Sequence, residues 1–199
     1  MTLTRRACVW GGIASVGLWG VGSATHGLAS PEANDASGVA HRWQHLRPFL
    51  GNPRLVGHDT YTYWGFDVYH ASLWAGPQAL PPEQWQSHRL ALELRYLRQF
   101  SGKDIAQRSI DEMQAQSPLP PSQAQAWLQQ LQGIFPNVRK GDRLTGVYLP
   151  DKGATFLLDQ APLGGIQDLE LAQRFFAIWL SPKTSAPALR QKLLANASA

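Results

Sequence analysis

Histidines and carboxylates are the side chains of this chain that could do chemistry, and few of them have the spacing of a reactive site. His41 and His45 are four residues apart, so they share one face of any helix that contains them. A zinc-protease helix would place a glutamate between the two histidines, whereas this chain has Arg42, Trp43 and Gln44 there. We interpret the pair as part of a solvated helix and expect no metal site.

The remaining polar positions favour structural roles over catalytic ones. His70 lies on a strand face that we expect to be buried, which favours a hydrogen-bonded core histidine over a base. Gly141 and Asp142 stand between apolar runs and predict a turn whose carboxylate caps local backbone amides. The sequence contains no GxSxG, P-loop, GxGxxG or CxxC motif, so we expect neither a nucleotide cofactor nor any other cofactor.

The amino-terminal residues have the pattern of an export signal. Arg5 and Arg6 precede an apolar, glycine-rich stretch at 7–21, and small residues stand before Ser30. We predict a signal peptide at 1–29, a flexible leader at 30–40 and one domain at 41–199, in the periplasm. Export through the general or the twin-arginine route stays open. Cleavage would remove Cys8, the single cysteine, so we expect no disulfide. It would also remove the apolar stretch, so we expect no membrane span in the mature chain.

Composition narrows the class of partner. A chain of 199 residues with 44% hydrophobic and 16% charged residues is typical of one globular domain. The formal net charge of +4 includes Arg5 and Arg6, so the mature chain would carry about +2. No basic run has interleaved aromatic residues, so we expect no nucleic-acid partner. A protein partner is left unspecified by the sequence.

Hydrophobic periodicity predicts the order of the elements. Strands are expected at 54–58, 60–65, 66–75 and 89–99, and in the last of these alternation predicts an apolar inner face and a charged, solvated outer face. Helices follow that begin at Ser101 and Ser122 with capping boxes to Asp104 and Gln125. A short helix at 40–49 would precede them. A hairpin around 151–153, a turn at Gly164-Gly165, a helix at 168–180 and a last helix at 187–194 follow. This order indicates an α+β fold with an antiparallel sheet and helices packed on one side.

Three blocks, at 64–74, 141–149 and 169–180, combine two alternating strands with a helical repeat. In this order they resemble the bacterial branch of the chalcone isomerase-like family, over residues 55–194. The resemblance implies an open-faced β-sandwich, in which a large antiparallel sheet is packed against a layer of helices with a ligand cleft between them. It also implies one of two activities, because plant members close a flavanone ring whereas other members bind fatty acids without catalysis.

The resemblance also supplies candidate site residues. Family enzymes use an arginine early in the sheet, a strand threonine, a tyrosine and an asparagine on the first cleft helix, and a threonine or serine on the later helix. Their matching positions hold Tyr69, Ile105, Glu112 and Ile178, and Arg54 is the cation nearest to the early arginine position. Ile105 cannot donate a hydrogen bond to a substrate carbonyl. We therefore take these five residues as ligand-binding candidates and name no catalytic residue.

These observations predict an exported, non-catalytic domain that binds a small apolar or amphiphilic, fatty-acid-like ligand in the cleft between sheet and helices. The ligand's carboxylate would be held by Arg54, Arg95 or Tyr69. One alternative is an isomerase of the intramolecular-lyase type with a rearranged site that uses Tyr69. Another is a structural or interaction module of the cell envelope, whose cleft is filled by its own side chains.

Overall fold

The structure is a computed structural model that describes residues 43–197. The predicted signal peptide at 1–29, the leader at 30–40 and His41 lie outside these residues. Among the described residues, no helix combines the length and the apolar character that crossing a membrane requires.

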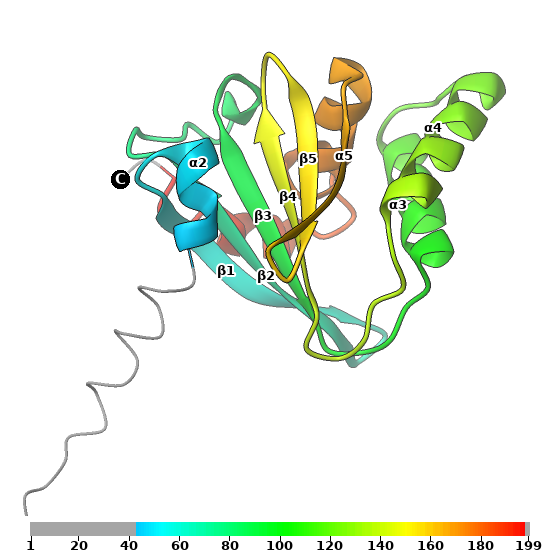
Figure 1. Cartoon of the computed structure of the whole chain (residues 1–199), viewed down its shortest axis with the longest axis horizontal. Coiled ribbons are helices and arrows are strands. Elements are labelled where there is room, and N and C mark those ends of the chain that lie inside the picture. Colours follow the sequence, from blue (N-terminus) through cyan, green and yellow to red (C-terminus); the bar gives the residue numbers. More distant parts are fainter. Residues whose placement is uncertain (1–42, 198–199) are drawn as a thin grey trace, which may run out of the picture.

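One antiparallel sheet of six strands forms the centre of the fold, and its strands follow one another in chain order (Figure 1). The strands are β1 (Arg54–Tyr63), β2 (Phe66–Ala75), β3 (Leu90–Tyr96), β4 (Arg143–Leu149), β5 (Gly153–Leu158) and β6 (Ala161–Ile166). The predicted α+β class with an antiparallel sheet is confirmed.

Helices cover the inner face of the sheet. They are α3 (Gly102–Gln116), α4 (Pro121–Ile134), α5 (Leu169–Leu180) and α6 (Pro187–Leu193). Two single 3-10 turns and a short helix complete the elements: η1 (Gln44–Leu46), α2 (Arg47–Leu50) and η2 (Trp85–Ser87). In Figure 1, α3 and α4 lie on one side of the sheet and α2 lies on the other.

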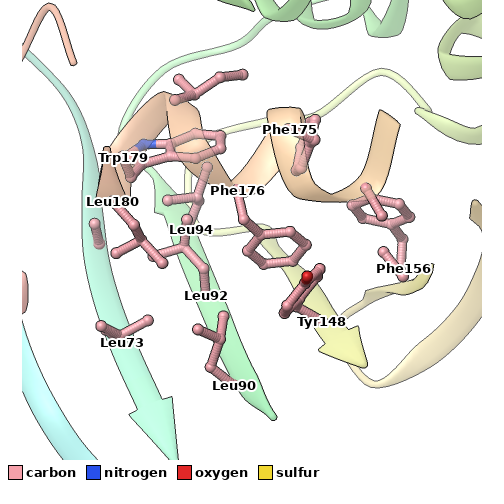
Figure 2. Packing of buried hydrophobic residues seen from close by; sticks show 14 of the residues in the cluster. Leu73, Leu90, Leu92, Leu94, Tyr148, Phe156, Phe175, Phe176, Trp179 and Leu180 are labelled. Atoms are coloured by element: carbon pink, nitrogen blue, oxygen red, sulfur yellow. The ribbon is translucent and has the colours of Figure 1, made fainter. Parts of the chain in front are cut away.

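The helix α5 supplies the centre of the main core. Phe175, Phe176 and Trp179 are buried against side chains of the sheet such as Leu92 and Tyr148 (Figure 2). A side chain at Gly146 of β4 would bring its Cβ within 3.0 Å of the Phe176 ring, so glycine lets this helix approach the sheet closely. The aromatic face at 169–180 thus fixes the helix layer on the strands.

The strand β3 follows the predicted alternation, with Leu90, Leu92 and Leu94 in the main core. We expected its other face to be charged and solvated, and this is wrong. Ala91 and Glu93 are buried as well, and Ala91 packs with Leu46 of η1 and other apolar residues in a second cluster. The short helices before β1 therefore cover part of the outer face.

Helix starts were predicted correctly where a side-chain cap exists. The Ser101 Oγ accepts a hydrogen bond of 3.1 Å from the Asp104 amide, and Asp168 Oδ1 accepts hydrogen bonds from the first turn of α5. The second predicted capping box, Ser122 with Gln125, is wrong. The helix α4 begins at Pro121 after Pro120 and has no side-chain cap, because proline suits the first helical position by itself.

One strand prediction and one turn prediction are also wrong. The segments 54–58 and 60–65 form one strand, β1, which pairs with β2 along its length through two register shifts. Gly164 and Gly165 do not form a turn, since they lie in β6 and pair with Phe156 and Thr155. The reversal lies instead at Asp159 and Gln160, both with positive φ.

Candidate functional site

A cavity of about 340 Å³ lies between the inner face of the sheet and the helices α3 and α5. Its walls are mostly apolar and aromatic, and they come from β1, β2, β3, β4, α3 and α5. The apolar lining residues are Val68, Leu94, Phe100, Ile105, Leu144, Phe175, Ile178 and Ala186. The cavity thus lies where the sheet and the helix layer meet, and both supply its walls.

The structure brings four of the five candidate residues together around this cavity. Tyr69 of β2, Ile105 and Glu112 of α3, and Ile178 of α5 all line it. Arg54 lies elsewhere, because its guanidinium donates hydrogen bonds to the backbone carbonyls of Gln78, Asn196 and Ala197. Arg54 therefore ties the carboxyl-terminal segment to β1 and is not part of the cavity wall.

Aromatic side chains form the wall of the cavity on the sheet side. The Tyr69 ring stacks on the Tyr61 ring with centroids 5.1 Å apart, and it meets the Tyr96 ring edge to face at 6.0 Å. The Tyr69 hydroxyl accepts a hydrogen bond of 3.0 Å from the indole N–H of Trp179. The residue as a whole is half-buried, but its phenol is enclosed by these three rings.

Burial sets the protonation of these phenols. It raises the pKa of Tyr69 well above its ordinary value, and the weaker effect of the Trp179 hydrogen bond opposes this shift. Burial also raises the pKa of Tyr96, and it raises the pKa of Tyr61, which Arg108 partly offsets. At neutral pH the three residues are therefore neutral phenols, able to form hydrogen bonds but not to take up a proton as phenolate bases.

The charged residues that line the cavity, Asp104, Arg108 and Glu112, all lie on α3. Arg108 Nη2 pairs with Glu112 Oε1 at 2.5 Å, and the Ser185 hydroxyl donates a hydrogen bond of 2.7 Å to the other Glu112 oxygen. Glu112 is buried and Arg108 is half-exposed. The Arg108 guanidinium also lies 5.5 Å from the centre of the Tyr63 ring. With Asp104 and Ser109 of the same helix, these groups form the polar part of a mostly apolar and aromatic cavity.

Arg108 was missed by reasoning from the sequence. Its spacing contains the signal, because residues three and four apart share a helix face, and Arg108 stands three residues after Ile105 and four before Glu112. Once α3 faces the cavity with Ile105 and Glu112, Arg108 lies on the same side. The early arginine position of the family lies nearest to Arg54 instead.

The other polar positions have structural roles. Asp142 Oδ2 accepts a hydrogen bond of 2.8 Å from the Arg139 amide, which confirms the predicted turn. His70 is hydrogen-bonded at 2.6 Å to Thr60 but is half-buried, so its expected place in the core is wrong. A smaller polar pocket of about 160 Å³ includes His45 and Glu93. Within residues 43–197, no three His, Cys, Asp or Glu side chains group as a metal site requires.

Comparison with known proteins places this geometry in a family. An uncharacterized protein of Haemophilus influenzae is 30% identical over 139 residues, which cover 70% of this chain and 66% of that protein, slightly less than two thirds of its length. The crystal structure of a fatty-acid binding protein of Arabidopsis thaliana superposes with a TM-score of 0.57 at 12% identity, over 74% of this chain and 89% of that one. At 12% identity, the similarity to this structure shows a shared fold alone. The family model described as chalcone isomerase-like matches residues 54–195, so the chain belongs to the chalcone isomerase-like family, as its sequence pattern predicted.

Proposed function

We propose that this protein binds a small apolar or amphiphilic molecule, such as a fatty acid, in the cavity between the sheet and α3 and α5, without catalysis. The observation that carries the proposal is the cavity itself, which has mostly apolar walls and one polar part. Its volume of about 340 Å³ falls within the range of small-molecule sites in proteins. The fatty-acid binding protein of the same fold supports the class of ligand.

The distribution of polar groups predicts how the ligand is oriented in the cavity. A hydrocarbon chain would lie among Leu94, Phe175 and Ile178, where its transfer from water is favourable. A carboxylate head group would lie at the polar part, beside Arg108. An arginine has five N–H donors in a planar fork, so the contact between Arg108 and Glu112 leaves donors for a second carboxylate.

The chemistry of the cavity wall supports a non-catalytic role. Ring closure of a chalcone needs the attacking oxygen as an anion and a polarised carbonyl. Ile105 lines the cavity, and the family resemblance matches its position to a tyrosine of the enzymes. An aliphatic side chain can neither donate a hydrogen bond nor order a water. The raised pKa of Tyr69 keeps its hydroxyl protonated, so it is a poor substitute base.

Native mass spectrometry of the gently purified protein tests the proposal, with thermal unfolding in the presence of dodecanoate and dodecanol as a second measurement. We expect a co-purified amphiphile and a rise in melting temperature with ligand concentration. No bound molecule together with no thermal shift would count against binding. Turnover of a chalcone above its spontaneous rate, followed by loss of visible absorbance, would overturn the non-catalytic assignment.

We also propose that the protein acts in the periplasm after removal of residues 1–29. The support is the pattern of Arg5, Arg6, the apolar stretch and the small residues before Ser30. Cell fractionation followed by amino-terminal sequencing tests it. A mature protein that starts at Ser30 in the periplasmic fraction is expected, and a cytoplasmic protein with an intact amino terminus would contradict it.

A further inference from the structure

We propose that the end of the β1–β2 hairpin, residues 63–66, docks on the surface of an anionic lipid bilayer. This hairpin tip carries three large aromatic side chains that the rest of the fold leaves open to solvent. Trp64 is 83% exposed, Phe66 58% and Tyr63 49%. Exposed aromatic residues gathered on one short turn mark an interaction site more often than a requirement of the fold.

The backbone of the hairpin tip strengthens this inference. Trp64 and Gly65 form a two-residue turn between paired strands, with φ of 51° and 77°. Such turns favour asparagine followed by glycine, and a bulky residue in the left-handed region is strained. Within residues 43–197, the Trp64 ring contacts one other aromatic ring, that of Tyr63 at 6.2 Å, and the residue is 83% exposed, so packing against these residues does not compensate for the strain. A contact outside the molecule would account for tryptophan at this position.

The chemistry of the hairpin tip fits a membrane surface. Tryptophan and tyrosine concentrate at the interface of bilayers, where an apolar ring with one polar group is accommodated. The Arg98 guanidinium lies 4.7 Å from the centre of the Phe66 ring, and Arg108 lies over Tyr63. Within residues 43–197, no carboxylate lies at ion-pair distance from Arg98. This cation is therefore placed to meet anionic head groups while the aromatic rings enter the interface.

The position of the hairpin tip links docking to the cavity. Tyr63 and Arg108 belong both to the surroundings of the hairpin tip and to the lining of the cavity. A docked protein would thus hold the polar part of the cavity against the bilayer, so that an amphiphile passes between membrane and cavity with little exposure to water. This step rests on the proposed function, whereas the docking itself can be measured alone.

Vesicle binding of the purified protein tests the docking, with vesicles of phosphatidylglycerol and phosphatidylethanolamine compared with vesicles of phosphatidylcholine. The informative variant is Trp64→Asn, because Asn-Gly suits this turn and the fold should keep its melting temperature. The matched control is Leu169→Asn, which removes another exposed apolar side chain, 49% exposed, away from the hairpin tip. Co-sedimentation measures binding, and tryptophan fluorescence with brominated lipids reports insertion.

We expect the unmodified protein to bind the anionic vesicles, Trp64→Asn to reduce this binding about tenfold, and Leu169→Asn to leave it unchanged. Dodecanoate binding in solution should be equal in all three proteins, which separates a failure of docking from a failure of the cavity. No binding of the unmodified protein to anionic vesicles would overturn the proposal. So would equal losses in both variants, or a Trp64-dependent association of the protein with itself in the absence of vesicle binding.

Discussion

The indole N–H of Trp179 donates a hydrogen bond of 3.0 Å to the phenolic oxygen of Tyr69, and this bond joins α5 to β2 at the wall of the cavity. Both residues line the cavity, and both pack against further aromatic rings, Phe175 and Tyr61. This hydrogen bond thus connects the helix layer directly to the sheet beside the cavity that lies between them.

This hydrogen bond should contribute measurably to stability. Tyr69→Phe keeps the ring but leaves the buried indole N–H without its acceptor, so we expect a loss of about 1–2 kcal/mol in the free energy of unfolding. Trp179→Phe should cost more, because it also removes buried surface. Denaturant unfolding of the two single variants and the double variant gives the coupling energy. A coupling energy near zero would show that the contact does not stabilise the fold.

The buried tyrosines predict how stability depends on alkaline pH. Burial raises the pKa of Tyr61, Tyr69, Tyr96 and Tyr148 in the folded protein. The unfolded chain has ordinary phenols that ionise at about pH 10, so it loses protons first as the pH rises. The stability that these phenols contribute is therefore fully present below about pH 10 and is lost as the pH rises further.

Absorbance titration of tyrosinate checks this prediction, with the denatured protein as the reference. We expect most tyrosines of the native protein to ionise above the denatured midpoint, and denaturant midpoints to fall between about pH 9 and pH 11. Tyr69→Phe should shrink the late phase of the titration. Coincident titration curves of native and denatured protein would contradict the assigned burial.

The elements that the sequence predicted well have strong local signals. The alternation in β3, the serine cap of α3 and the aromatic repeat of α5 each depend on neighbours a few residues away. The pair Gly164-Gly165 has an equally strong local signal for a turn, yet it lies in β6. A side chain at Gly165 would come within 2.7 Å of the Ala154 carbonyl, so glycine is needed for strand contact there, which no local pattern reveals.

The candidate site was likewise predicted only where its residues follow from local pattern or from the family resemblance. The family pattern placed Tyr69, Ile105 and Ile178 on elements that face one another, and the structure sets them around one cavity. Arg54 lies outside the cavity wall, although it is near the expected position along the chain. Which arginine faces the cavity depends on how α3 is rotated against the sheet, and that rotation is fixed by packing between distant segments. The burial of Glu93, which shares a pocket with His45 of η1, has the same non-local origin.

Replacement of glycine by alanine should have opposite effects on stability at two positions. Gly57 of β1 faces α6 so closely that an added Cβ would overlap the backbone carbonyls of Lys192 and Leu193. Gly57→Ala should therefore destabilise the fold by about 2–3 kcal/mol. Gly133 lies inside α4 with open space around it, so Gly133→Ala should stabilise by about 0.5–1 kcal/mol. Thermal unfolding of both variants compares them directly, and a neutral Gly57→Ala would mean that α6 does not pack as described.

The proposed ligand orientation predicts a selective effect at Arg108. Arg108→Gln should weaken binding of dodecanoate about five- to tenfold, because it removes one charged contact at a half-exposed position, and should leave dodecanol binding almost unchanged. Ile105→Trp should weaken both ligands, since the larger ring fills the apolar part of the cavity. Lys103→Gln, on the exposed side of α3, is the matched control for loss of one positive charge.

Displacement of a fluorescent fatty-acid probe measures ligand binding by all three variants, and melting temperatures verify that the fold tolerates the loss of the charged partner of Glu112. Equal weakening of dodecanoate and dodecanol by Arg108→Gln would show that the head group binds away from this arginine.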